Sequence, residues 1–193
     1  MKEGKVQRKR KLMVGFMAFI MIGSVFGVIF FGFATGGTSL KYNDLKFVRK
    51  GNVWTTNING KDAIFSYFPA EVELIEVKSE IIDMLRNKIE IDVTADANDT
   101  FIQSIALAQF QMKSTLGNFN VFVRDGSTTQ NSFNMPIITC DDATQIVPVI
   151  YFKEGNETKI YFNESCIIVE ADDNVDFIRA KDRIVYGMFD IIR

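Results

Sequence analysis

Residues 12–34 form an apolar run of twenty-three residues in which Ser24 carries the only hydrogen-bonding side chain. As an α-helix this run is ~34 Å long, at ~1.5 Å per residue. The hydrocarbon core of a bilayer is about 30 Å thick. Only a helix pairs every backbone N–H and C=O of a single crossing segment in lipid. The run therefore predicts one N-terminal transmembrane helix over residues 12–34, in contact with membrane lipid.

The charges in front of the run predict its orientation. Residues 1–11 carry six Lys or Arg and one Glu, and basic flanks stay in the cytoplasm. We therefore expect a basic cytoplasmic tail (1–11), a single pass through the cell membrane, a linker (35–45) and an extracytoplasmic domain (46–193). A cleaved signal peptide is the alternative, although its apolar part is only ~7–15 residues long. Gly23 and Gly27 have the GxxxG spacing of helix dimers, which glycine-rich helices also reach by chance.

Charge and residue usage exclude several classes of function. The chain has 22 Lys and Arg and 24 Asp and Glu, so 16 basic and 23 acidic residues lie beyond the tail, a net charge of −7. No nucleic-acid partner is expected, because such a partner needs clustered basic charge. The chain has no His, which removes the Ser-His-Asp triad, His zinc ligands and the usual general base near neutral pH. We expect no cofactor, and the sequence favours a domain that is not an enzyme.

The two cysteines, Cys140 and Cys166, bear on the compartment of the domain. Outside the cytoplasm, such a pair usually forms a structural disulfide. Two buried free thiols are the alternative. Neither residue belongs to a C-x-x-C pair, so dithiol redox chemistry has little support. The sequence therefore favours a disulfide between them.

Hydrophobic periodicity predicts an α/β (α+β) domain after the linker. An N-terminal β-meander has a hairpin signal at Asn59-Gly60, and a helical stretch follows over residues 70–88. The meander strands are expected at 46–49, 53–58 and 61–68.

A strand at 89–94, a helix that ends near Leu116 and a strand at 119–123 predict a parallel βαβ unit. Strict alternation in the first of these strands predicts that Ile89 faces the core and Asp92 faces solvent. The remaining strands, mainly antiparallel, are expected at 136–140, 149–152, 158–162 and 166–171, before a C-terminal helix to about Asp190.

Residues 89–190 resemble a thioredoxin-like core in their order: strand, helix, strand, short helix, two antiparallel strands, helix. The segment Ile146-Val147-Pro148-Val149-Ile150-Tyr151-Phe152-Lys153-Glu154-Gly155 is similar to that family's proline, strand and turn, in which the proline is cis. The resemblance implies a cis peptide bond at Pro148. The place of the family's C-x-x-C reads Asn98-Asp99-Thr100-Phe101 here, and domains without the dithiol tend to serve as binding modules. The whole chain also looks like membrane-anchored proteins of an archaeal type.

Four aspartates follow predicted strands, namely Asp96, Asp125, Asp141 and Asp142. Ligands of open α/β sheets bind beyond the carboxyl ends of the strands, and carboxylates there can hold Mg²⁺ or Ca²⁺. Asp is also a common turn and cap residue, and no acidic spacing matches a recognised metal-binding loop. A purely structural role is the favoured alternative for these four residues.

Three N-x-S/T sequences begin at Asn98, Asn156 and Asn163 and predict glycosylation in turns. A chain rich in Asn, Ser and Thr also contains such sequences by chance. The polar loop that ends with Phe133 and Met135 could contact a partner, although an ordinary connector is the simpler interpretation.

These observations favour a membrane-anchored extracytoplasmic binding or assembly domain with a protein partner at the cell surface. Two alternatives stay open. A divalent-metal-dependent enzyme would use Asp96, Asp141 and Asp142, and a redox-responsive thioredoxin-like domain would use Cys140 and Cys166.

Overall fold

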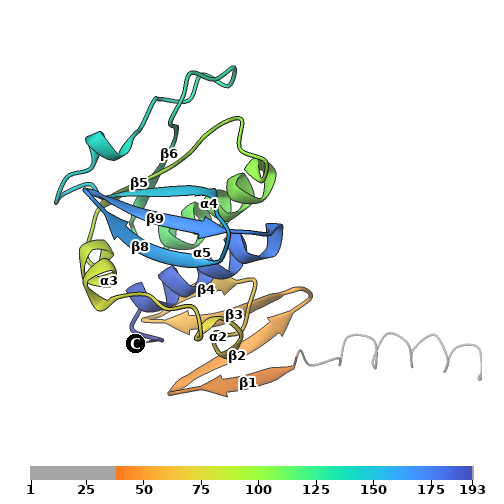
Figure 1. Cartoon of the computed structure of the whole chain (residues 1–193). Coiled ribbons are helices and arrows are strands. Elements are labelled where there is room, and N and C mark those ends of the chain that lie inside the picture. Colours follow the sequence, from red (N-terminus) through yellow and green to blue (C-terminus); the bar gives the residue numbers. More distant parts are fainter. Residues whose placement is uncertain (1–37, 193) are drawn as a thin grey trace, which may run out of the picture. The chain divides into compact units, whose positions relative to one another are not determined.

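The chain folds into two β-sheets and four α-helices over residues 38–192, the part that the computed structural model describes (Figure 1). The first sheet is an antiparallel meander in the order β1-β2-β3-β4. Its strands are β1 (Ser39–Tyr42), β2 (Leu45–Lys50), β3 (Val53–Ile58) and β4 (Lys61–Phe65). The hairpin predicted at Asn59-Gly60 is confirmed, because both residues have positive φ, 52° and 83°. Strand β1 lies within the residues that the sequence predicts as linker.

The second sheet has the strand order β6-β5-β7-β9-β8. Its strands are β5 (Glu90–Ala95), β6 (Phe122–Ser127), β7 (Val149–Glu154), β8 (Lys159–Asn163) and β9 (Cys166–Ala171). Strand β5 is parallel to β6 and β7, β7 is parallel to β9, and only the edge strand β8 runs antiparallel to its neighbour. Helix α4 (Ile102–Gly117) connects β5 to β6. The predicted parallel βαβ unit is therefore confirmed.

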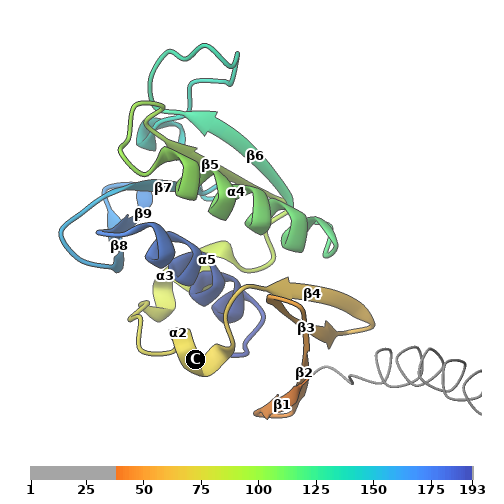
Figure 2. The same cartoon turned by 90° about the vertical axis from the view of Figure 1, so that its right-hand side faces the viewer.

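Helices and irregular chain cover opposite faces of the second sheet. Helix α4 and helix α5 (Asn174–Met188) pack on one face (Figure 2). Residues 137–147 cover part of the other face and include the short 3₁₀ helix η1 (Cys140–Asp142). There, a small apolar cluster forms between this segment and the sheet, and its buried members are Ile138, Val149, Cys166 and Ile168. The short helices α2 (Pro69–Val72) and α3 (Ser79–Leu85) pack against α5.

Helix α5 also joins the two sheets through one core. The rings of Phe65 on β4 and Tyr186 on α5 stack with centroids 4.0 Å apart, and both side chains are fully buried. The carboxylate of Asp182 accepts hydrogen bonds from the backbone N–H groups of Ser66 and Tyr67, at 2.9 and 2.8 Å. The meander is therefore held to the rest of the domain by apolar and polar contacts together.

The predicted fold class needs a correction. No helix within residues 38–192 is long and apolar enough to cross a membrane, so the fold is described as an α+β domain with two sheets. The helix predicted over residues 12–34, together with Gly23 and Gly27 inside it, lies outside the described residues.

The predicted order of the C-terminal strands was also wrong. The sequence predicts that residues 149–152 turn back into 158–162 as neighbours, whereas β9 lies between β7 and β8. All six residues of β9 are buried, while three of the five residues of β8 are exposed. The more apolar strand therefore occupies the interior position and β8 forms the edge. Residues 136–140 form no strand, and only Ile137 makes an isolated bridge.

The thioredoxin-like expectation for Pro148 was wrong as well. The described residues contain no cis peptide bond, so Pro148 is trans. Its carbonyl accepts a hydrogen bond from the N–H of Asp92 at 3.0 Å. The chain thus enters β7 directly from Pro148 and needs no tight turn there.

Candidate binding site: the α4 cleft

Helix α4 carries apolar side chains on more than its core side. Ile105, Ala108 and Met112 are fully buried, as their spacing predicts. Leu107 and Phe110 are also apolar, yet they lie on the outer surface of the helix, where 65% of Phe110 is exposed. Single exposed apolar residues are ordinary, whereas a contiguous apolar patch marks a contact surface, so the surroundings of Phe110 decide between the two.

A cleft of about 720 Å³ lies beside this surface. It is bounded by six residues of α4, by Ala95 and Ala97 at the end of β5, by Asp125 and Gly126 of β6, and by Phe133 and Met135 of the next loop. We call it the α4 cleft. Its size is typical of ligand pockets, and its place beyond the carboxyl ends of parallel strands is typical of binding sites in α/β sheets.

One polar group in the α4 cleft has no partner. Gln109 is 7% exposed, and its Nε2 makes no hydrogen bond to any of the described residues. A buried amide that lacks a partner costs about 1–3 kcal/mol. Gln109 is one of the residues that line the α4 cleft, so its unpartnered Nε2 is a candidate donor to a group bound there.

The loop of residues 128–136 shapes the outer wall of the α4 cleft. The side-chain oxygen of Asn131 accepts hydrogen bonds from the N–H groups of Phe133 and Met135, at 2.9 and 3.2 Å. Its Nδ2 donates to the carbonyl of Met135 at 3.2 Å. These bonds fix the loop while 74% of Phe133 stays exposed. The loop is therefore a wall of the α4 cleft that its own hydrogen bonds fix in place, rather than a plain connector.

The charged rim of the α4 cleft is internally neutral. Lys113 of α4 forms an ion pair with Asp125 of β6. This pair is partly exposed and contributes little to stability. It places one positive and one negative group at the outer margin of the cleft, where they are free to interact with a polar main chain.

The four aspartates predicted as a metal site do not come together. No group of three or more His, Cys, Asp or Glu within residues 38–192 is arranged to hold a metal ion. Asp96 accepts from the N–H of Asn98, which is the main cause of its lowered pKa, and Asp142 caps η1 through the N–H of Thr139. Asp125 pairs with Lys113, as above, and Asp141 is exposed. The metal prediction is therefore corrected in favour of turn, cap and ion-pair roles.

The predicted disulfide is confirmed. Cys140 and Cys166 are bonded, with their Cα atoms 5.0 Å apart. The bond joins η1 to the start of β9 and belongs to the small core on the sheet face opposite the helices. The proposed acceptor residues Asn98, Asn156 and Asn163 are all exposed, and their glycosylation stays a prediction.

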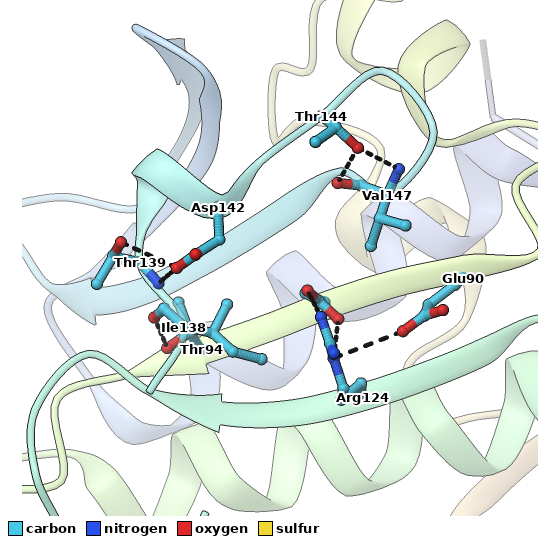
Figure 3. A network of polar contacts seen from close by, with 9 residues as sticks. Glu90, Thr94, Arg124, Ile138, Thr139, Asp142, Thr144 and Val147 are labelled. Carbon is cyan, nitrogen blue, oxygen red and sulfur yellow. Dashed lines mark hydrogen bonds and ion pairs between the residues drawn. The ribbon is translucent and has the colours of Figure 1, made fainter. Parts of the chain in front are cut away.

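A polar network on that same face holds the 137–147 segment to the sheet (Figure 3). Arg124 of β6 makes a two-pronged ion pair with Asp92 of β5, at 2.8 Å from Nε and 2.5 Å from Nη2. The hydroxyl of Thr94 donates to the carbonyl of Ile138 at 2.8 Å. Asp92 is 1% exposed, so its predicted position in solvent was wrong, whereas Ile91 and Val93 are fully buried, as the alternation predicts. Ile89 is 81% exposed and lies just before β5.

A second polar cluster surrounds Glu170 on β9. Its carboxylate accepts from Lys153 at 2.9 Å, from Lys159 at 3.2 Å and from the hydroxyl of Tyr161 at 2.8 Å. Burial raises the pKa of Glu170, but these hydrogen bonds outweigh burial and lower it. Because every partner is already supplied by the sheet, the cluster is a structural network.

Comparisons of the chain with protein-family models, with curated proteins and with solved structures returned no match. The site therefore stands on its own geometry. The sequence pointed to Phe133, which is exposed, and to Met135, which is partly buried, but it did not point to Gln109. A Gln between two apolar residues in the middle of a helix was the available signal.

Proposed function

We propose that residues 38–192 form a protein-binding domain that works in an oxidising compartment outside the cytoplasm, with the α4 cleft as its contact surface. The observation that carries the proposal is an apolar cleft lined by Gln109, whose buried Nε2 has no partner among the described residues. An apolar group of a partner fills such a cleft, and an acceptor beside that group satisfies the amide.

The exposed aromatic rings support a protein rather than a small polar ligand as the partner. Phe110 and Phe133 flank the α4 cleft from two different elements. Aromatic residues around a desolvated centre dominate the energetics of protein interfaces. The charged rim of the α4 cleft is small and has no net charge. It therefore favours a partner that is recognised by its shape and its polar main chain rather than by its charge.

The disulfide supports the compartment. Disulfides form and persist in oxidising environments and are rare in the cytoplasm. The redox-responsive alternative uses the same bond, but Cys166 is fully buried and the bond ties two elements of a packed core. A structural bond in an oxidising compartment explains both facts.

The function is tested by affinity capture with the full chain in detergent. Ala106 is an exposed residue of the α4 cleft, so Ala106→Trp fills the cleft, and Leu107→Trp places the same ring outside it. We expect a protein that is retained by wild type and by Leu107→Trp and lost with Ala106→Trp. Capture of nothing reproducible, or of the same proteins by all three, would contradict the proposal.

The compartment is tested separately by protease treatment of intact cells. We expect residues 38–192 to be digested or released from the outside, and the released domain to contain the disulfide by non-reducing mass spectrometry. Full protection of this domain until the cells are lysed would count against an extracytoplasmic location.

A further inference from the structure

Strand β6 has a free edge next to the α4 cleft. It lies at the end of the second sheet, and among the strands within residues 38–192 it pairs along its length only with β5 (Figures 1 and 2). The N–H of Phe122 donates to Ile89 and the N–H of Thr128 donates to Ala95, so the even-numbered residues direct their backbone groups to β5. Alternate residues of a strand direct these groups to opposite edges. Val123 and Asp125 therefore direct N–H and C=O to the outer edge, where Asp125 is partly exposed and Val123 is 1% exposed.

The chain already pairs with the last residue of this edge. The N–H of Ser127 donates to the carbonyl of Pro136, and the N–H of Ile138 donates to the carbonyl of Ser127, each at 2.9 Å. Ser127 and Ile137 thus form a parallel bridge. This contact shows that the outer edge of β6 accepts an added strand, and it leaves the groups of the partly exposed Asp125 for another one.

A strand added there would also reach the α4 cleft. The side chain of Asp125 lies on the helix side of the sheet, where it meets Lys113 of α4. Side chains on one face of neighbouring strands lie beside each other, about 5 Å apart. Alternate side chains of an added strand therefore lie over the cleft, near Phe110.

We propose that an extended segment of a partner protein adds to the free edge of β6 as a strand and places an apolar side chain in the α4 cleft. This inference rests on the proposed function and gives its mode of recognition. Main-chain hydrogen bonds supply affinity in such complexes, and pockets for alternate side chains supply specificity.

A second copy of this chain fits the edge less well. A symmetric antiparallel pair that uses both Val123 and Asp125 places Val123 opposite Asp125 of the other copy. The same register places Arg124 directly opposite Arg124 of the other copy. Like charges in directly opposite positions destabilise a sheet, so the edge favours a partner of different sequence.

The test uses the full chain in detergent and a phage library of random twelve-residue peptides. Enriched peptides are synthesised, and their affinities are measured by fluorescence anisotropy for wild type, Asp125→Ala and Asp125→Pro. Both variants lose the ion pair with Lys113, but only Pro removes the N–H on the free edge. Edge strands tolerate Pro where that N–H faces solvent. We expect Asp125→Pro to weaken binding at least tenfold relative to Asp125→Ala.

Peptide N-methylation is the second measurement and does not depend on how the Pro variant folds. Methyl groups on alternate backbone nitrogens of one edge should weaken binding at least tenfold, and those on the other edge should leave it within about twofold. Equal effects on both edges, or equal binding by both Asp125 variants, would overturn strand addition.

The outcomes separate this inference from the proposed function. If peptide binding is unchanged by Asp125→Pro and by N-methylation but is lost with Ala106→Trp, the α4 cleft remains the site and strand addition is excluded. If wild type enriches no peptides relative to Ala106→Trp, both strand addition and the proposed function are excluded. Sedimentation of the peptide-free chain as a dimer that Asp125→Pro dissociates would replace the partner segment with a second copy.

Discussion

Asp182 shows most clearly how single residues hold the two sheets together. Its carboxylate is fully buried, forms an ion pair with the equally buried Lys181, and accepts two backbone N–H groups from the turn after β4. The pair is costly to desolvate, but loss of one member leaves the other charge buried without compensation.

Asp182→Ala should therefore destabilise the domain by about 3–5 kcal/mol. Asp182→Asn combined with Lys181→Met removes both charges and keeps an acceptor for the backbone, so this double variant should be more stable than Asp182→Ala. Urea unfolding of the full chain measures both. A double variant that is less stable than the single one would contradict the assignment of the loss to an uncompensated charge.

Glu170 links the pH of the solution to stability. Its pKa in the folded state lies below the ordinary value of 4.5, so ionised Glu170 favours folding. This contribution is complete above the unfolded pKa and is lost as the pH falls through the folded one.

The stability difference between wild type and Glu170→Gln should consequently be largest near neutral pH and shrink below about pH 4.5. Urea unfolding at intervals from pH 7 to pH 3 measures this difference, with Glu157→Gln, at an exposed residue of the same surface, as the control. A constant difference across this range would exclude the proposed linkage.

At this scale the sequence predicted some partners and missed others. It predicted the Cys140–Cys166 bond, because cysteine pairing depends on residue type and compartment. Simple alternation predicted Asp92 in solvent. It does not show that Arg124 of a neighbouring strand lies opposite Asp92 and neutralises its buried carboxylate. Gln109 was missed because the helical pattern does not show that this polar side chain is buried.

Among the elements, the 137–147 segment depends most on long-range contacts. It has almost no regular structure, and it is held by the disulfide, by the bridge between Ser127 and Ile137, and by its small apolar cluster. Sequence patterns predicted a strand over residues 136–140, because an apolar run between polar loops is typical of one. The run instead caps the open face of the second sheet.

Replacing both cysteines with Ala should destabilise the domain by roughly 3–4 kcal/mol in the chain-entropy model for this loop length. The loss should appear first as faster amide hydrogen exchange in residues 137–147, while α4 keeps its protection. Equal acceleration in α4 and in this segment would show that the bond acts on the whole domain instead.

The element types and the βαβ unit followed from periodicity, whereas the order of the C-terminal strands did not. Both β8 and β9 read as strands in the sequence. β9 takes the place beside β7 because it is the more buried of the two strands. This difference in burial arises only when one of them pairs with β7, so the sequence alone does not show it.

At the scale of the whole molecule, the two sheets share one hydrophobic core through α5. Trp54, the only Trp of the chain, lies buried in the meander, whereas most helical residues within 38–192 belong to α4 and α5. Residues 38–192 should therefore unfold as one cooperative unit.

Trp54 fluorescence and circular dichroism at 222 nm should give coincident urea transitions. Because the fluorescence reports on the meander and the circular dichroism on the helices, the two signals follow different parts of the core. An earlier fluorescence transition would show that the meander is a separate folding unit.

Function was the least predictable level from the sequence. The absence of His and of a dithiol motif favoured a binding domain, but the proposed binding surface is assembled from β5, α4, β6 and a loop. No segment carries its signature alone, because the α4 cleft exists only where these elements meet.

Site-specific photo-crosslinking in intact cells tests the central claim most directly. A benzophenone amino acid at Ala106, in the α4 cleft, is compared with the same group at Ala70, an exposed residue of α2. The account predicts a discrete crosslinked protein from position 106 that is absent from position 70. Crosslinks of equal pattern from both positions, or none from position 106, would contradict the α4 cleft as the site of partner binding.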